Sequence, residues 1–375
     1  MGGKVEFEIN QQRAYILKKF RVGIIGCGLI GRKRALSLDE ENTLVARCDT
    51  DCKISDRFGE TFSCEPFTDY KDLLHSTYCD IVIVSVINKF AKDIVVDALR
   101  MGRHVLVEKP LGRDATEARE MIAYSRDGIL YGNSIYKENS SRDCSDIPLL
   151  KVGFNHRFHP AIWKAKVLFH DGAIGQCLSI RARYGHGGRS GMEKEWRASK
   201  DLCGGGELLD QGVHVIDLIR WFGGEITEVF GKTETKHWEM NVEDNAVAIL
   251  KTENDVTASF SVSWTNWKNI FSFEIFGTDG YLRIEGLGGS YGVETLELGR
   301  RKKEGGVPDI QLFEFPMEDT SWAMEWKEFL SAIKENRQPI GNGIDGLMAN
   351  EVIEAIYQSS LLGKVVKIHE NRHIL

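Results

Sequence analysis

Residues 22 to 31 read Val22-Gly23-Ile24-Ile25-Gly26-Cys27-Gly28-Leu29-Ile30-Gly31, and this segment decides the fold of the chain. An apolar run leads into glycines spaced G-x-G-x-x-G, and a helical pattern follows. Glycines at these positions permit a tight turn, a close approach of the main chain to a pyrophosphate, and close packing of helix on strand. The helix N-terminus attracts negative charge. A dinucleotide site is therefore predicted at Gly26, Gly28, Leu29, Ile30 and Gly31.

An acidic residue supports this prediction. Asp49 stands 18 residues after Gly31, at the end of the second apolar run. A carboxylate at that point can bind the adenosine ribose hydroxyls, and it would repel a 2′-phosphate, so NAD is favoured over NADP. The alternative is that Asp49 only caps a turn.

The first part of the chain alternates apolar runs with helical segments, which is typical of βαβ units and a parallel sheet. Residues 21–158 are predicted to form a Rossmann domain, and residues 1–20 an N-terminal extension that is helical from Gln11 to Phe20. The polar stretch Arg126 to Pro148 is predicted to be a surface excursion. The expected strands are Val22 to Ile25, Leu44 to Cys48, Ile81 to Val86, His104 to Val107 and Leu150 to Phe154.

Residues 159–375 follow a different pattern, with helices near 161–170 and 207–221, a series of alternating strands, and two closing helices. Turn signals at Asn254-Asp255 and at Thr278-Asp279-Gly280 suit hairpins. The predicted fold class is α/β: an N-terminal Rossmann dinucleotide-binding domain plus a C-terminal α/β domain with a large, mostly antiparallel open sheet. The expected strands cover 177–184, 226–235, 246–252, 256–264, 271–276, 281–285, 295–298 and 311–315.

The amino-acid composition argues against several classes of partner. The net charge of -7 gives no cationic field for a nucleic acid. No apolar run approaches the roughly 20 residues that span a bilayer, and the polar start of the chain does not look like a secretory signal. The eight cysteines form no C-x-x-C pair. A cytoplasmic protein without nucleic-acid, membrane or metal partners is expected.

Several polar residues end predicted strands at the carboxyl edge of the sheet, where ligands of open α/β sheets bind. Ser85, Val86 and Asn88 close the third long run, and Glu108 and Lys109 follow the fourth. All five are predicted to line the cofactor. The ammonium of Lys109 could also polarise a substrate oxygen. The alternatives are strand termination with Asn88 as a helix cap, and a surface lysine.

A second group of polar residues lies on the apolar helix that follows Gly204-Gly205-Gly206. Asp210, His214 and Asp217 are spaced i, i+4 and i+7, so they are predicted to share one helix face. Buried polar groups must find partners or serve a site. The glycine run, which lets another molecule approach, favours a site over an internally satisfied Asp-His pair.

Taken together, the chain resembles the Gfo/Idh/MocA oxidoreductase family, through residues 22–31, 104–112, 152–158 and 204–223. The resemblance implies that Lys109 is the active-site lysine and that the peptide before Pro110 is cis. It implies that His214 is the acid/base, that Asp210 binds substrate beside it, and that Arg157 lines the substrate side. It also implies a sheet that often forms the subunit interface, and hence a homo-oligomer, dimer or tetramer, through the C-terminal sheet.

The sequence departs from the family pattern in the excursion Arg126 to Pro148 and in the stretch after the third strand. The stretch Val86 to Phe90 lacks the proline and histidine that often follow the third strand, which bears on nicotinamide contacts. In the variable loop 184–197, Trp196 and Arg197 could take a sugar face and a phosphate. The alternative is that Trp196 packs under the loop and the arginines are solvated.

The resulting hypothesis is an NAD-dependent oxidoreductase that transfers a hydride between nicotinamide and a hydroxyl carbon of a sugar, nucleotide sugar or cyclitol. Lys109, His214 and Asp210 are the expected catalytic residues. Two alternatives stay open: a redox-neutral conversion with tightly bound NAD, and a non-enzymatic regulator that senses dinucleotide.

Overall fold

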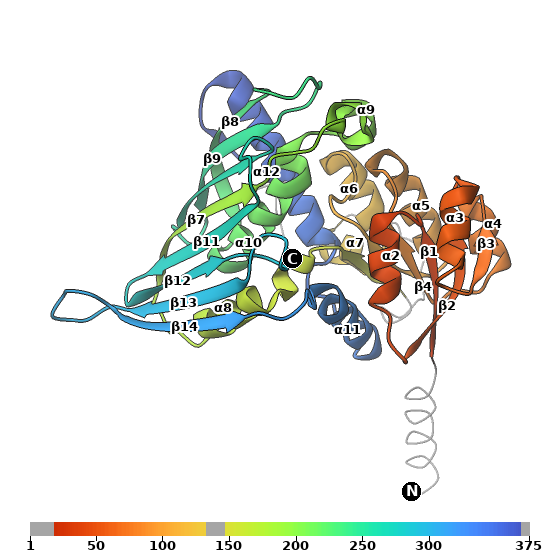
Figure 1. The fold of residues 1–375 in the computed structure, drawn as a ribbon, viewed down its shortest axis with the longest axis horizontal. Coiled ribbons are helices and arrows are strands. Elements are labelled where there is room, and N and C mark those ends of the chain that lie inside the picture. Colours follow the sequence, from red (N-terminus) through yellow and green to blue (C-terminus); the bar gives the residue numbers. More distant parts are fainter. Residues whose placement is uncertain (1–18, 133–146, 369–375) are drawn as a thin grey trace, which may run out of the picture.

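The computed structural model describes residues 19–132 and 147–368, which form two sheets with helices packed on them (Figure 1). Residues 11–18 of the predicted helix Gln11 to Phe20 lie outside the described residues, and Phe20 is not helical but begins strand β1 (Phe20–Ile25). The middle of the predicted excursion, residues 133–146, lies outside the described residues as well. Its start, Arg126–Leu130, forms the short helix α7.

The first sheet is parallel throughout, with strand order β3-β2-β1-β4-β5-β6. The Rossmann prediction is therefore confirmed. Strand β3 and helices α3 and α4 were not among the predicted elements. The strands are β1 (Phe20–Ile25), β2 (Asn42–Cys48), β3 (Glu65–Phe67), β4 (Ile81–Val84), β5 (His104–Val107) and β6 (Leu150–Val152), and the helices are α2 (Leu29–Leu36), α3 (Cys52–Gly59), α4 (Tyr70–Ser76), α5 (Asn88–Arg100) and α6 (Ala115–Ile122).

The second sheet has the order β14-β13-β12-β11-β7-β10-β9-β8-β15. Only β7 and β10 pair in parallel, so the prediction of a mostly antiparallel sheet is confirmed. Both predicted hairpin turns are present, between β9 and β10 and between β11 and β12. The strands are β7 (Cys177–Gly185), β8 (Ile226–Glu234), β9 (Asn245–Thr252), β10 (Thr257–Ser263), β11 (Ile270–Gly277), β12 (Gly280–Glu285), β13 (Glu294–Arg300), β14 (Asp309–Phe315) and β15 (Val366–Lys367).

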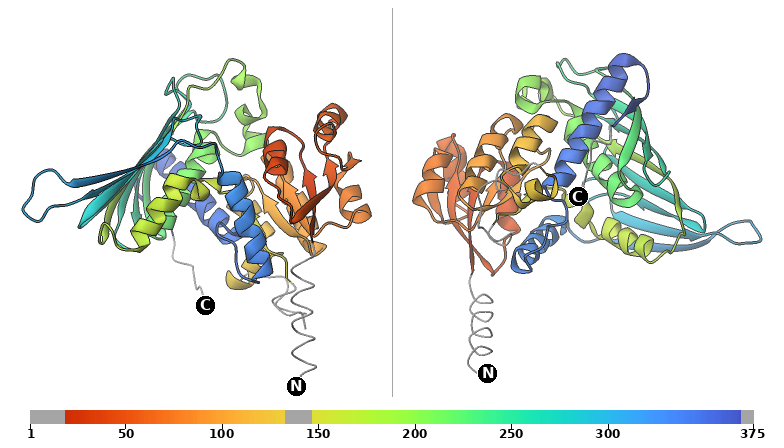
Figure 2. Two further views of the ribbon diagram at one scale, coloured as in Figure 1. Left: turned by 60° about the horizontal axis from the view of Figure 1, so that its bottom comes forward. Right: turned by 180° about the vertical axis from the view of Figure 1, so that it is seen from behind.

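Helices cover one face of this sheet and leave the other open (Figure 2). They are α8 (Pro160–His170), α10 (Val213–Gly223) and α12 (Gly343–Leu362). Helix α11 (Ser321–Lys334) instead returns to the first sheet, where Trp326 and Phe329 pack in one core with Val22 and Ile24. The strands thus divide near residue 158, whereas α11 crosses back over that boundary.

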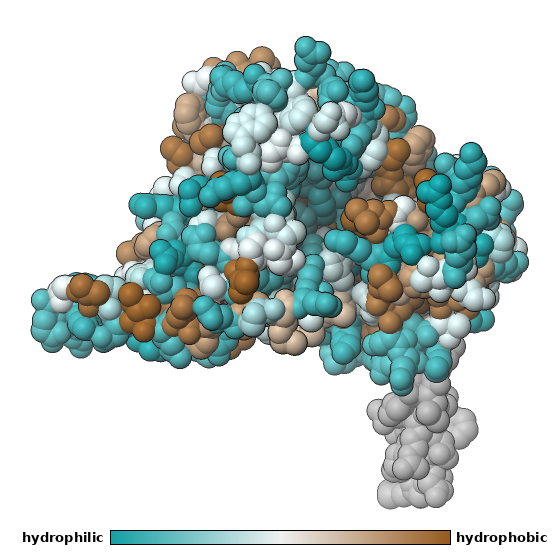
Figure 3. Space-filling model, viewed as in Figure 1, coloured by the Kyte–Doolittle hydropathy of each residue, from teal (hydrophilic) through white to brown (hydrophobic). Residues whose placement is uncertain are grey.

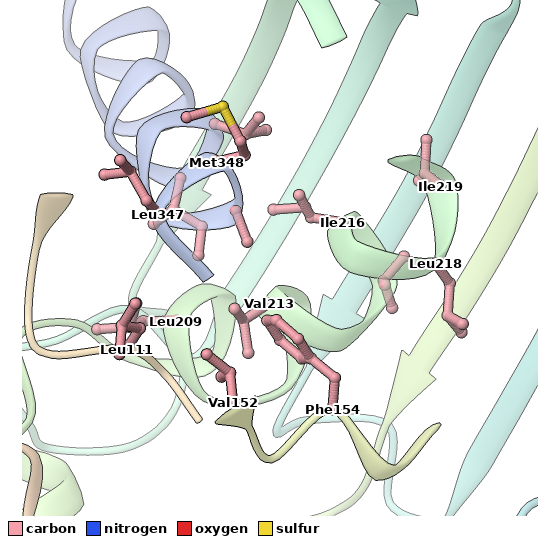
Figure 4. Close-up of a cluster of buried hydrophobic side chains, with 14 of the residues drawn as sticks. Leu111, Val152, Phe154, Leu209, Val213, Ile216, Leu218, Ile219, Leu347 and Met348 are labelled. Atoms are coloured by element: carbon pink, nitrogen blue, oxygen red, sulfur yellow. The ribbon is translucent and has the colours of Figure 1, made fainter. Parts of the chain in front are cut away.

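The two domains share a continuous apolar core (Figure 4). Val152 and Phe154, at the end of β6, meet Val213 on α10 and Leu347 on α12, and all four side chains are fully buried. This core fixes the start of α10 against the carboxyl edge of the Rossmann sheet. Among the helices of the described residues, none has the length and apolar character needed to cross a lipid bilayer.

Candidate active site

The glycine loop joins β1 to α2 as the sequence predicts. Gly26 has a φ of 95°, which favours glycine, and a Cβ on Gly31 would lie 1.9 Å from the carbonyl oxygen of Gly26. A Cβ on Gly28, by contrast, would meet nothing within 4 Å. Gly28 precedes the first turn of α2, whose N-terminus has no side-chain cap. Open space in front of uncapped N–H groups fits the pyrophosphate of a dinucleotide, with Leu29 and Ile30 at the start of the helix beside it.

Asp49 lies against this loop. Its Oδ2 accepts the main-chain N–H of Cys27 at 2.9 Å, and its Oδ1 accepts that of Asp51 at 2.9 Å. Asp49 therefore caps a turn and braces the glycine loop at the same time. A carboxylate has about four acceptor positions, so this arrangement leaves acceptor capacity for a ribose hydroxyl.

The residues after β4 connect the loop to the second domain. The hydroxyl of Ser85 donates to the carbonyl of Gly26 at 2.8 Å, and Val86 is half-buried beside it. The amide of Asn88 donates to the carbonyl of Cys203 at 2.8 Å. Asn88 is not the cap of α5, because Ile87 holds that position, so this alternative is wrong. Its side chain bridges the two domains at the mouth of the site.

Glu108 occupies a different place from the predicted one. Its carboxylate accepts the guanidinium of Arg34 at 2.6 Å, and Arg34, fully buried, also contacts Glu325 on α11 at 2.6 Å. The sequence predicts a cofactor contact for Glu108, whereas the structure directs its side chain to a structural ion pair. The following Lys109-Pro110 peptide is cis, as the family resemblance implies.

Lys109 and Asp210 meet across the domain boundary. The ammonium of Lys109 donates to Oδ1 of Asp210 at 2.8 Å and to its main-chain carbonyl at 2.6 Å. Burial would raise the pKa of the Asp210 carboxyl, but the charges of Lys109 and Arg197 outweigh this and lower that pKa to about 2. Asp210 lies in a π-helical turn, Leu208–Gly212, a distortion that is frequent at functional sites.

His214 lies one turn further along, in the buried part of the site. Burial, with the nearby charge of Lys109, holds the pKa of its imidazole well below the usual range. The ring is therefore neutral at physiological pH. Its Nδ1 has no hydrogen-bond partner among the described residues.

His156 is a site residue that the sequence analysis missed. Its ring stacks on that of His214, with centroids 3.6 Å apart and planes 15° from parallel. It lies in the short helix η2 (Asn155–Phe158), within the run 152–158 that carries the family resemblance. The signal was available, because a histidine stands directly beside Arg157.

Arg157 does not face the site. Its guanidinium donates to both oxygens of Asp217, at 2.8 and 2.6 Å, and contacts Asp345 at 3.1 Å. All three guanidinium nitrogens thus contact carboxylates of the C-terminal domain, and the residue is buried. We therefore assign Arg157 a structural role in place of the expected substrate contact. Asp217 pairs with Arg157, whereas Asp210 pairs with Lys109.

The surface is hollowed between the two domains (Figure 3). Trp196 and Arg197 lie beside the Lys109-Asp210 pair. The guanidinium of Arg197 lies 4.4 Å from the centre of the Trp196 ring and 3.4 Å from Oδ2 of Asp210. Both residues line a small pocket with Asn88 and Asp210. Trp196 also packs under the loop, against the apolar cluster around Trp264, as the alternative held.

Glu207 is a second group that the sequence analysis missed. It is fully buried, and neither carboxylate oxygen has a hydrogen-bond partner among the described residues. Burial, reinforced by the charge of Asp210, raises the pKa of this carboxyl well above its usual range. Glu207 interacts electrostatically with Asp210, Lys109 and Tyr184. The parts of the chain that the structure describes contain no cluster of three or more His, Cys, Asp or Glu suited to a metal ion.

A dinucleotide cradle that faces a lysine, a carboxylate and a neutral imidazole defines the class of NAD-dependent oxidoreductases. The sequence comparisons agree with this class. Residues 20–128 match the oxidoreductase family with an NAD-binding Rossmann fold, and residues 162–283 match the GFO/IDH/MocA C-terminal domain. The chain belongs to the Gfo/Idh/MocA oxidoreductase family.

Named relatives span nearly the whole chain. D-apiose dehydrogenase from Paraburkholderia graminis is 23% identical, and the match covers 94% of this chain and 90% of that protein. The structure of levoglucosan dehydrogenase with NADH and L-sorbose superposes with a TM-score of 0.80 at 20% identity, covering 94% of this chain and all of the other. The WlbA dehydrogenase from Bordetella pertussis, in complex with NADH and UDP-GlcNAcA, has a TM-score of 0.75 at 19% identity, with coverage of 94% and 100%.

Proposed function

We propose that this NAD-dependent enzyme transfers a hydride between nicotinamide and a hydroxyl carbon of a sugar, a nucleotide sugar or a cyclitol. One observation carries the proposal: Lys109 and Asp210, from different domains, are hydrogen-bonded beside the neutral imidazole of His214. The relatives named above act on or bind sugars and a nucleotide sugar, which supports this substrate class.

Each residue has a definite task in this reaction. His214, neutral before the reaction, accepts the proton of the substrate hydroxyl. The ammonium of Lys109, oriented by Asp210, donates a hydrogen bond to the substrate oxygen as negative charge develops there. The remaining acceptor positions of Asp210 can take a second hydroxyl. Bound NAD supplies the hydride acceptor, held by the glycine loop and Asp49.

Trp196 and Arg197 contact the part of the substrate that lies furthest from the reacting carbon. An aromatic face next to a guanidinium suits a sugar ring followed by an anionic group. Because Arg197 also contacts Asp210, a substrate that engages this arginine is held close to the reacting atoms. A phosphate at this point would distinguish a nucleotide sugar from a free sugar or cyclitol.

The test is a screen of NAD reduction with free sugars, nucleotide sugars and cyclitols, followed by Lys109→Ala on the best substrate. General acid-base and oxyanion contacts are worth about 10²- to 10⁴-fold in rate, so a loss in that range is expected. Lys92→Ala, a lysine of α5 paired with Glu120 at the surface, is the matched control and should keep wild-type turnover. Full activity in Lys109→Ala would end the proposal. Retained nucleotide without net NADH release would identify a redox-neutral conversion instead.

We also propose that the open face of the second sheet joins copies of this chain into a dimer or tetramer. On β9, Ala248 and Leu250 are buried toward the helices, while Val247 and Ile249 are about half exposed on the other face, near Phe230 of β8. Apolar side chains grouped on an uncovered face mark association surfaces. Light scattering should show an oligomer, and Val247→Lys with Ile249→Lys should yield a monomer. A wild-type monomer at micromolar concentration would refute this.

We further infer a cytoplasmic location. The seven cysteines within the described residues are unpaired, and four of them are buried, which suits a reducing compartment. Fractionation of cells that contain the protein checks this, and recovery outside the cytoplasm would contradict it.

A further inference from the structure

His156 has no part in the chemistry described so far, although it touches the base directly. Its imidazole lies face to face with that of His214, at a centroid distance of 3.6 Å. Both side chains are about 95% buried or more, so neither ring has solvent to turn into. A stacked ring in a close-packed site restricts the orientation of its partner.

Hydrogen bonds fix the tautomer of His156. The hydroxyl of Ser321 donates to the Asp319 carboxylate at 2.6 Å, so its oxygen accepts the amide N–H of Asn155 at 3.0 Å. The amide oxygen of Asn155 is then an acceptor, and it takes the Nδ1–H of His156 at 3.2 Å.

The other ring nitrogen is consequently an acceptor. In a neutral imidazole only one nitrogen carries a proton, so Nε2 of His156 accepts the hydroxyl of Tyr184 at 3.1 Å. The chain of bonds that begins at Asp319 thus runs through His156 to Tyr184, whose hydroxyl is also hydrogen-bonded to that of Tyr291. It holds the His156 ring at both nitrogens.

The charges around the two rings keep His156 neutral. Burial first, and then His214, His159 and Lys109, hold the pKa of His156 well below its usual range. The charged or titratable groups that act on His214 are Lys109, His159 and Arg34. His156 therefore stays neutral, so a neutral ring lies against His214 when that imidazole takes up the substrate proton.

We propose that His156 is a positioning residue of the reaction: held in one tautomer between Asn155 and Tyr184, its ring fixes the plane of the His214 imidazole by stacking on it. This inference rests on the proposed role of His214 as the base. The proposal predicts that the rate of proton transfer depends on the aromatic ring at position 156 and its stacking on His214, and depends less on the hydrogen bonds of the ring nitrogens.

Two variants of His156 distinguish the effect of ring stacking from the effect of hydrogen bonding by the ring nitrogens. His156→Leu removes the flat ring, and His156→Phe restores it without hydrogen bonds. With the best substrate of the screen, His156→Leu should lower kcat at least tenfold, while KM and the dissociation constant of NADH change less than threefold. His156→Phe should recover most of that loss. Wild-type kcat in His156→Leu, or equal defects in the two variants, would overturn the proposal.

A second measurement does not depend on turnover. In histidine-labelled protein, the carbon-bound protons of His214, assigned by comparison with His214→Asn, should be shifted upfield by the ring current of residue 156. The shift should persist in His156→Phe and vanish in His156→Leu. Identical His214 signals in wild type and His156→Leu would refute the stacking, whether or not a sugar substrate has been found. A failed screen with the expected signals would refute the proposed function alone.

Discussion

Two buried polar clusters lie along the helical segment 207–223, and they differ in how completely their members are paired. The closed cluster is Arg157, Asp217 and Asp345, in which every guanidinium nitrogen of Arg157 contacts a carboxylate. The open cluster consists of Glu207, Asp210, Gln211 and His214 with Lys109. Within the described residues, it retains four polar atoms without partners: both oxygens of Glu207, Oε1 of Gln211 and Nδ1 of His214.

This difference in pairing indicates which cluster serves stability and which serves activity, although both lie on the same helical segment. A buried polar atom costs free energy unless it is hydrogen-bonded, so folding alone favours the closed arrangement. The open cluster keeps unpaired atoms where the dinucleotide edge of the first domain meets the second, next to the pocket lined by Asn88 and Asp210. These buried atoms have hydrogen-bonding capacity that the described part of the folded chain leaves unused. The comparison predicts that the open cluster controls activity and the closed cluster controls stability.

The largest expected effect is on activity, through His214→Asn in the open cluster. Removal of the proton acceptor should lower kcat/KM by about 10²- to 10⁴-fold. The thermal midpoint should stay within a few degrees of wild type, because Nδ1 of His214 has no partner to lose. Steady-state kinetics and thermal unfolding measure the two effects. A variant that unfolds readily yet retains turnover would reverse the comparison.

The next effect is on stability, through Asp217→Asn in the closed cluster. Breaking a buried ion pair so that one charge is left uncompensated costs about 3–5 kcal/mol, and because Asp345 still contacts Arg157 in this variant, a loss at or below the lower end of that range is expected. Urea denaturation should show this loss, whereas exposed Asp56→Asn on α3 should stay within about 0.5 kcal/mol. At temperatures where the variant remains folded, its KM should be close to wild type. A loss of activity without loss of stability would mean that Asp217 serves the substrate.

The distinction between the clusters could not be obtained from the sequence. Local patterning predicts five of the six Rossmann strands and all eight long strands of the second sheet, because an apolar run or an alternation is a property of neighbouring residues. Strand β3 reads Glu65-Pro66-Phe67, which lacks the apolar run that marks the other Rossmann strands. The glycine loop, Lys109, Asp210 and His214 were predicted because a motif fixes them relative to adjacent elements.

Ion pairs between residues far apart in the sequence could not be predicted. Arg157 lies 60 residues from Asp217, and Arg34 lies 74 from Glu108. No local spacing encodes such pairs. The π-helical turn at Leu208–Gly212 is also not evident from the sequence. The sequence therefore predicts which residues are polar and central, and the structure decides which of them are already paired.

A smaller effect is expected at Asp49, which is paired within the chain, like the closed cluster, and can also bind a ligand, like the open cluster. Its carboxylate already accepts two main-chain N–H groups, yet it keeps acceptor capacity for the ribose. Asp49→Asn should weaken NADH binding by about 1.5–3 kcal/mol, the usual worth of a hydrogen bond to a charged group. It should weaken NADPH binding less, since it removes the repulsion of a 2′-phosphate. Fluorescence titration of both nucleotides tests this, and an unchanged ratio of affinities would leave Asp49 as a turn cap only.

The smallest effect is expected at Glu207, whose buried carboxyl should make the unfolding free energy depend on pH. Burial raises the pKa of this carboxyl well above its usual value of 4.5, so at intermediate pH the folded state keeps a proton that the unfolded chain releases. Its contribution is complete below pH 4.5 and declines as pH rises toward the raised pKa. Glu207→Gln is neutral at every pH, so its unfolding free energy should fall less steeply from pH 5 to 8 than that of wild type. Exposed Glu60→Gln is the matched control. Parallel curves for wild type and Glu207→Gln would show that Glu207 is paired in solution, and the open cluster would then be smaller than described.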